Sequence, residues 1–341
     1  MRYGRSKAVV VAFVGAAAML GCSGGSLGGA SSPVDAAASG FDATAAPETT
    51  VVASFGGDPL GALWGSTSQN IWLVGGHTQN PEGGGAPEGE RIVHFYGSGW
   101  SDAQTPSTSA LFAVWGAASD DVWSGGGDGM ISGSGVILHY DGMTWSQVAQ
   151  VHDTVSAIWG SSSSDVWFAG GFSIWHWDGS AIGLISAPKP TDGYLTLWGF
   201  SASDVWAAGA NGTLMHWNGS VWTAVPTTSS LYIFGLWGAS SKDLWGVGND
   251  GYQLHWNGTA INSTNTLDYT GFNTIYGLNA KDIWALGSCC WQDGGSEPWG
   301  AHYDGERWSY QKMPAIGFAT ALMATSGIYS AIINNTLVQW P

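Results

Sequence analysis

The histidines are the residues of this sequence whose number and spacing first suggest chemistry. Imidazole nitrogens bind transition metals and transfer protons near neutral pH. Six of the eight histidines occupy the same position of an internal repeat: His94, His139, His176, His216, His255 and His302. Whether these six form one site depends on the elements that carry them.

Those elements belong to a repeat of roughly 40 residues, which is the signature of a repeat architecture. Alternating apolar and polar residues, as in 213–217, indicate four short strands per unit. Asp-Gly or Asn-Gly pairs at 141–142, 178–179, 218–219, 257–258 and 304–305 predict tight hairpins between strands three and four, with positive φ at both central positions. In six units a Trp-Gly or Tyr-Gly pair stands eight residues before the aromatic residue of Asp-x-Trp or its equivalent: Trp64 and Trp72, Trp115 and Trp123, Trp159 and Trp167, Trp198 and Trp206, Trp237 and Trp245, Tyr276 and Trp284.

A degenerate seventh unit follows Trp308, with strand-like segments at 321–324, 328–329 and 336–340 but no fourth strand. At the other end, 49–55 is a strand-like segment that belongs to no unit. We therefore predict an all-β fold, a seven-bladed β-propeller over 49–341 whose ring is closed by the 49–55 strand completing the last blade. An open β-solenoid is the alternative, but the missing and the spare strand argue for closure. The length leaves no room for a second domain.

The full repeat reads Trp-Gly-x5-Asp-Val-Trp, followed by His-Trp-Asp/Asn-Gly-x2-Trp. Over about residues 49–341 it resembles the tectonin-like and related Trp-rich propellers of bacterial surface lipoproteins, and it is similar to WD repeats. The resemblance implies the fold and says almost nothing about function. The pattern departs from the Asp-box of sialidase-type propellers, Ser-x-Asp-x-Gly-x-x-Trp, because Asp and Gly are adjacent here. That difference argues against a glycosidase.

A closed ring changes the interpretation of the six histidines. Equivalent positions on successive blades lie too far apart to share one ion at ligand distances of about 2 Å. We expect each histidine to hydrogen-bond within its own blade, as the WD resemblance implies, and the repeat tryptophans to pack blade against blade. We predict no metal and no cofactor. The expected histidine partners are the turn residues Asp121, Asp165, Asp204, Asp243 and Asp282.

Departures from the repeat are not explained by packing. From the second-strand aromatic residue to the histidine position the separation is 22 residues in unit one, 16 in unit two and 18 in unit six, against 9 or 10 elsewhere. All these insertions fall between strands two and three, so we expect them to converge on one sector of one face, formed by units six, seven, one and two. Loops on a rigid scaffold often bind ligands, although solvated loops without a ligand are the alternative. The candidate ligand-binding residues are His77, Glu82, Glu88, Glu90, Arg91, Asp128, Cys289, Cys290, Trp291, Gln292, Asp293 and Trp299.

Cys289 and Cys290 are adjacent in the sequence. A disulfide between them would be strained, because consecutive Cα atoms lie ~3.8 Å apart and disulfides usually need ~4.4–6.8 Å. Such a bridge next to Trp291 suggests a rigid ligand platform, as in some quinone-cofactor propellers, but the docking repeats of those enzymes are missing here. No stretch has the acidic spacing of a calcium loop.

The N-terminus reads as a targeting segment, with Arg2, Arg5 and Lys7 before an apolar run that ends at Leu20. The sequence Met19-Leu20-Gly21-Cys22 resembles a bacterial lipobox, although Met and Leu are unusual at their positions. We predict a signal peptide over 1–21, a lipidated Cys22 with a flexible Gly/Ala/Ser linker over 22–48, and an outer-membrane location. An ordinary cleaved secretory signal is the alternative. Loss of three basic residues takes the net charge from −16 to −19, which disfavours nucleic acid as a partner.

Together these observations favour a monomeric, non-enzymatic binding or scaffold propeller that contacts the membrane through its lipid alone. The expected partner is a glycan or an envelope protein, since aromatic and polar loop residues suit sugars and no nucleophile and base stand out. The competing hypothesis is a secreted lyase or hydrolase that uses His77, Glu82, Glu88 or Glu90. A structural coat without a ligand is the third.

Overall fold

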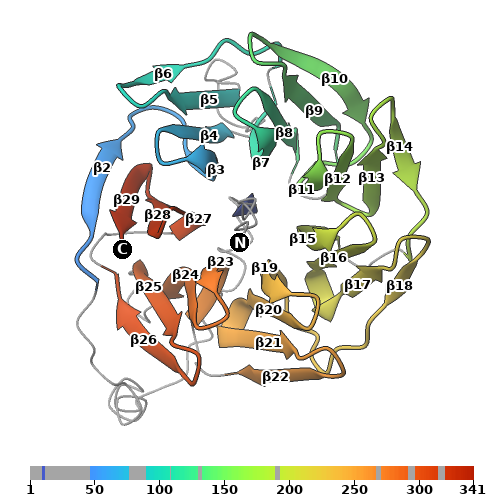
Figure 1. The fold of residues 1–341 in the computed structure, drawn as a ribbon, viewed down its shortest axis with the longest axis vertical. Coiled ribbons are helices and arrows are strands. Elements are labelled where there is room, and N and C mark those ends of the chain that lie inside the picture. The colour runs from blue at the N-terminus through green and yellow to red at the C-terminus, as the bar shows by residue number, and fades with distance from the viewer. Residues whose placement is uncertain are drawn as a thin grey trace, which may run out of the picture.

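Seven antiparallel sheets surround a common axis in the computed structural model, as Figure 1 shows. The structure describes residues 10–11, 47–76, 90–107, 109–129, 133–188, 193–265, 270–290, 296–313 and 319–341. In blades one to six, four consecutive strands pair in sequence order, from the inner strand near the axis to the fourth strand at the rim; in blade seven the rim strand comes from the N-terminal part of the chain. The predicted all-β, seven-bladed propeller is therefore confirmed.

The strands of the seven blades have the following bounds. Blade one has β3 (Leu60–Thr67), β4 (Asn70–Gly76), β5 (Glu90–Phe95) and β6 (Trp100–Asp102). Blade two has β7 (Leu111–Ala118), β8 (Asp121–Gly127), β9 (Gly135–Tyr140) and β10 (Trp145–Val151). Blade three has β11 (Ala157–Ser162), β12 (Asp165–Gly170), β13 (Ser173–Trp177) and β14 (Ile182–Ile185). Blade four has β15 (Tyr194–Ser201), β16 (Asp204–Gly209), the 3-10 turn η2 (Ala210–Gly212), β17 (Leu214–Trp217) and β18 (Trp222–Ala224). Blade five has β19 (Ile233–Ser240), β20 (Asp243–Gly248), η3 (Asn249–Gly251), β21 (Tyr252–Trp256) and β22 (Ile261–Asn265). Blade six has β23 (Thr270–Asn279), β24 (Asp282–Cys290), β25 (Ser296–Tyr303) and β26 (Trp308–Lys312). Blade seven has β27 (Ala319–Thr325), β28 (Ile328–Ile333), β29 (Thr336–Trp340) and β2 (Thr50–Ser54).

The ring is closed by β2, the predicted 49–55 strand, which pairs antiparallel with β29. The turn residue Asn335 strengthens this closure: its Oδ1 accepts the Leu60 N–H at 2.6 Å, and its Nδ2 donates to the Asp58 carbonyl at 3.2 Å. A further strand, β1 (Val10–Val11), pairs antiparallel with β7 near the axis. Its two residues belong to the segment predicted to be a signal peptide.

The glycine of the Trp-Gly or Tyr-Gly pair is explained in blades two, three, four and six by the contact between neighbouring first strands. A Cβ atom on Gly116, Gly160 or Gly199 would lie 2.5–2.6 Å from the Cη2 atom of the tryptophan in the preceding blade, so only glycine fits beneath that ring. Between blades six and seven both partners change together. Tyr276 stands at the tryptophan position and Ala324 at the glycine position, so the smaller ring is matched with the residue that carries a Cβ.

The second-strand tryptophans lie between their own blade and the next. Trp167 stacks on His176 of the same blade, with 4.2 Å between ring centroids, and on its other side contacts Trp217 and Trp222 of blade four at 5.1 and 5.5 Å. The same arrangement recurs around Trp72 and around Trp245. The predicted packing role of these tryptophans is therefore confirmed.

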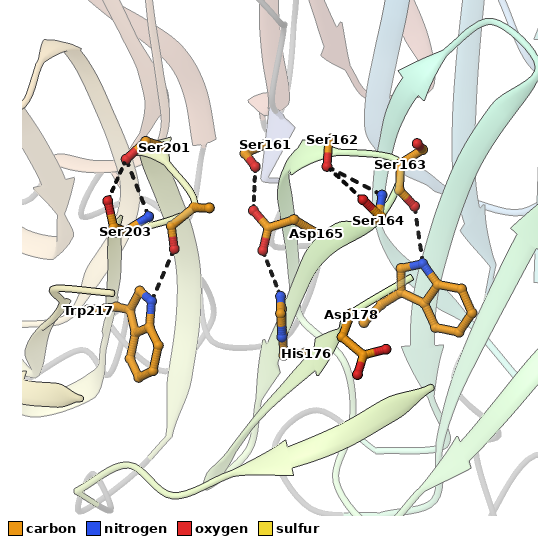
Figure 2. A network of polar contacts seen from close by, with 12 residues as sticks. Ser161, Ser162, Ser163, Ser164, Asp165, His176, Asp178, Ser201, Ser203 and Trp217 are labelled. Carbon is orange, nitrogen blue, oxygen red and sulfur yellow. Dashed lines mark hydrogen bonds and ion pairs between the residues drawn. The ribbon is translucent and has the colours of Figure 1, made fainter. Parts of the chain in front are cut away.

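The repeat histidines donate from Nε2 to the aspartate that begins the second strand of the same blade. Figure 2 shows the pair in blade three, where Ser161 also donates to Asp165. The predicted pairing is confirmed in five blades, at 2.6–2.9 Å: His139 with Asp121, His176 with Asp165, His216 with Asp204, His255 with Asp243 and His302 with Asp282. Blade one differs, because Asn70 occupies the aspartate position opposite Thr67.

The hairpins between strands three and four occur where the Asp-Gly and Asn-Gly pairs predicted them, but their turn type differs from the prediction. The glycines have positive φ, from 89° to 95°, whereas the preceding Asp or Asn does not. In blade four, Asn218 Oδ1 instead accepts the N–H groups of Ser220 and Val221 at 3.0 and 3.1 Å. The side chain satisfies the turn, so a second left-handed residue is not required.

Candidate functional site

In every blade the second strand ends and the third strand begins at the same face of the ring, which we call the insertion face. In blade order these connections span residues 77–89, 128–134, 171–172, 210–213, 249–251, 291–295 and 334–335. The innermost strands β23, β27, β3 and β7 are successive neighbours. Blades six, seven, one and two are therefore adjacent, as the sequence predicted.

Blade six departs from the prediction in one respect. Its additional residues do not all form a loop, because β24 and β25 are longer than their counterparts and pair as far as Cys290 opposite Ser296. Cys289 pairs with Thr270 on one side and Glu297 on the other.

Several predicted site residues fall outside the part of the chain that the structure describes, so their prediction stays untested. They are Cys22, His77, Glu82, Glu88, Trp291, Gln292 and Asp293. Trp299 is described: it lies half-buried on β25, opposite Gly287 and Lys312.

Glu90 begins β5 directly after the 77–89 insertion. Its Oε1 accepts hydrogen bonds from the Thr105 hydroxyl and, at 3.2 Å, from the Ser107 N–H in the link between blades one and two. Its Oε2 is buried and has no partner among the described residues. Burial raises the pKa of the Glu90 carboxyl above its usual value, although its backbone hydrogen bonds oppose the shift. Oε1 of Glu90 is therefore occupied by hydrogen bonds within the propeller.

Arg91 ties the ring-closing segment to blade one. Its Nε donates to Asp102 at 3.1 Å, and its Nη1 donates to the carbonyls of Gly56 and Asp58, which lie between β2 and β3. The structure therefore gives Arg91 a role in ring closure, which the sequence did not predict. Asp128 makes one described contact, in which its Oδ1 accepts the Ser109 hydroxyl at 2.7 Å.

A polar cluster at the boundary of blades two and three was missed by the sequence reasoning. His152 and Asp153 follow β10, and Ser173, at the start of β13, hydrogen-bonds to both of them. Thr154 donates to the Gly129 carbonyl at 2.5 Å, which joins this cluster to the insertion of blade two. A signal was present in the sequence, because His152 is one of two histidines outside the repeated position.

The described residues contain no group of three or more His, Cys, Asp or Glu side chains placed to hold a metal ion. Within the same residues, no helix is long and apolar enough to cross a membrane.

The fold defines this chain as a seven-bladed β-propeller with WD40-like structural neighbours. It is similar to the WD40 repeats of RRP9, with 11% identity and a TM-score of 0.62 over 87% of this chain and 99% of that one. It is also similar to the WD40 propeller of Doa1 (13% identity, TM-score 0.63, 86% and 96% covered) and to YCF48 bound to a D1 peptide (12%, 0.63, 87% and 96%). No family model matches the chain, and no curated protein matches it. At these identities the likeness concerns the fold alone.

Proposed function

We propose that this protein is a non-enzymatic binding or scaffold propeller, held at a bacterial cell envelope by a lipid on Cys22, whose partner is a glycan or another envelope protein. One observation carries the proposal. The longer connections belong to blades six, one and two, within a sector of four successive blades, and they join strands at the insertion face. The hairpins of the opposite face keep one length between strands one and two and one length between strands three and four. Variable loops on a rigid, uniform scaffold are where binding residues concentrate.

The described polar groups favour binding over catalysis. Glu90 has one carboxyl oxygen occupied by the blade link. The Ser173 hydroxyl donates to Asp153 and its oxygen faces His152 Nε2 as an acceptor, so these groups do not have the order of a Ser-His-Asp triad, in which the hydroxyl donates to the histidine. YCF48, a neighbour in fold, is bound to a D1 peptide, which supports a protein partner as one of the two alternatives.

Replacing residues 77–89 by the short Ala-Asn-Gly turn of blade four is expected to abolish partner binding while leaving the propeller folded. The insertion lies between β4 and β5, and its removal leaves both strands in place. Binding is measured on a glycan array and with purified envelope proteins. The matched control changes the blade-five turn to the same sequence, through Asn249→Ala and Asp250→Asn, and should bind like the wild type. Turnover of a hydrolase substrate panel, with no binding in either screen, would overturn the proposal.

Cys22→Ala is expected to release the protein from the membrane fraction and to abolish its labelling by a radioactive fatty acid. The reason is that the composition of residues 23–48 predicts a tether, so the lipid is the proposed membrane contact. Ser23→Ala serves as the control and should remain labelled. An unlabelled wild-type protein would show that the segment is an ordinary secretory signal.

A further inference from the structure

The cluster formed by His152, Asp153, Phe172 and Ser173 has a defined geometry on the insertion face. Ser173 Oγ lies 2.7 Å from Asp153 Oδ2 and 3.0 Å from His152 Nε2. The Phe172 N–H also donates to Asp153 Oδ2, at 3.3 Å. Asp153 and Ser173 are each 7% exposed, whereas the His152 side chain is 63% exposed. Two buried groups thus hold one exposed imidazole.

The direction of the hydrogen bonds among Asp153, Ser173 and His152 determines which nitrogen of His152 carries the proton. The Asp153 carboxylate only accepts, so the single hydroxyl hydrogen of Ser173 points toward Asp153. The Ser173 oxygen is then left to accept from His152 Nε2–H. In the neutral imidazole the other nitrogen, Nδ1, carries no hydrogen and is an acceptor. Any group that hydrogen-bonds to Nδ1 must therefore be a donor.

The surroundings of His152 add an apolar surface to this acceptor. The ring packs edge-on against the buried Trp175, with 5.7 Å between centroids, which holds its orientation. Phe172 is joined to the cluster by its N–H, which donates to Asp153, and it is one of the exposed large apolar side chains, at 37%. A hydrogen-bond acceptor and an exposed aromatic side chain in one cluster match a sugar, whose hydroxyls donate and whose C–H face packs on rings.

We infer that His152 and Phe172 form a carbohydrate subsite, in which His152 Nδ1 accepts a sugar hydroxyl and Phe172 packs against the sugar ring. Asp153 and Ser173 are positioning residues that set the tautomer and orientation of His152. This inference rests on the proposed binding function and chooses a glycan over a protein as its ligand. The residue after Asp153, Thr154, contacts the first part of the blade-two connection by donating to the Gly129 carbonyl.

Binding to an array of defined bacterial surface oligosaccharides and peptidoglycan fragments tests the inference. The strongest-binding oligosaccharide of that array is then titrated by calorimetry against the full-length protein and its variants. His152→Ala and Phe172→Ala should each weaken binding about tenfold, since each removes one contact. Leu184→Ala, which truncates a more exposed apolar residue on the rim strand of the same blade, should change affinity by less than about twofold.

The positioning role has a separate readout. Nitrogen NMR of the wild-type protein should show His152 protonated at Nε2, and Ser173→Ala should lose that preference while the fold persists. If the wild type binds no sugar on the array but binds an envelope protein, the carbohydrate inference fails and the binding function stands. If sugar binding survives both substitutions but is lost with the 77–89 replacement, the subsite is wrong. If nothing binds, both proposals fail.

Discussion

Gly199→Ala is expected to lower the free energy of unfolding by about 2–3 kcal/mol, an effect at the upper end for one added methyl group. The new Cβ would lie 2.6 Å from Trp159 Cη2, and Trp159 is itself buried between blades three and four. In a Trp159→Tyr background the same substitution should cost less than about 0.5 kcal/mol, because the ring atoms that clash are gone. Denaturant unfolding of the four proteins gives the coupling energy directly.

Two controls separate this clash from a general effect of glycine replacement. Gly183→Ala, on β14, has no heavy atom within 4 Å of the new Cβ and should not destabilise the protein. Ala324→Gly, at the boundary where tyrosine already replaces tryptophan, should change stability by less than about 1 kcal/mol. Equal losses for Gly199→Ala in the wild-type and Trp159→Tyr backgrounds would contradict the proposed origin of the Trp-Gly repeat.

Acidification is expected to destabilise the propeller through blade one, by up to about 3 kcal/mol between pH 6.5 and pH 4. Burial lowers the pKa of His94 from 6.5 to about 4. The ring is 6% exposed and stacks on Trp72 with 3.6 Å between centroids, and its Nε2 has no partner among the described residues. Between pH 6.5 and pH 4, His94 is protonated in the unfolded chain but stays neutral in the folded chain. The contribution is complete above pH 6.5, falls as the pH drops toward 4, and then changes no further.

Asn70→Asp should remove much of this acid sensitivity. The substitution recreates in blade one the aspartate of the other blades, and a carboxylate next to His94 raises the pKa of the imidazole toward its ordinary value. The reciprocal change, Asp204→Asn in blade four, should cost about 1–3 kcal/mol at neutral pH because it removes the charged acceptor shared by His216 and Trp206. Thermal unfolding across pH 4–7 compares these proteins with His94→Phe, which has no imidazole to titrate. An unchanged acid loss in His94→Phe would rule out this residue as the cause.

The two predictions also show where blade one differs from its neighbours. Asn70 Oδ1 and His94 Nε2 are both buried without a described partner, in the blade that also carries the longest insertion. Unpartnered buried polar atoms are costly. We therefore expect hydrogen exchange to find blade one among the least protected blades.

The sequence by itself determined the scaffold. The eight-residue spacing from Trp64 to Trp72 and its equivalents predicted six blades, the strand-like segments after Trp308 predicted the seventh, and the unclaimed strand at 49–55 predicted the closure. This was possible because every blade must solve the same packing problem, so the same residues recur at the same spacing. The Asp-Gly and Asn-Gly pairs also predicted the positions of five hairpins between strands three and four. The turn type differs from the prediction, as in blade four, where Asn218 Oδ1 accepts two backbone N–H groups.

Only the tertiary structure decided what the non-repeating residues do. Arg91 was a candidate ligand residue by its place beside an insertion, but its guanidinium holds the carbonyls of a segment 33–35 residues away. Ser173 hydrogen-bonds to Asp153, 20 residues away in the sequence, and Leu60 hydrogen-bonds to Asn335, 275 residues away. Such contacts occur once and leave no period in the sequence. They depend on which chain segments the closed ring brings together at its insertion face, and that is a property of the assembled blades.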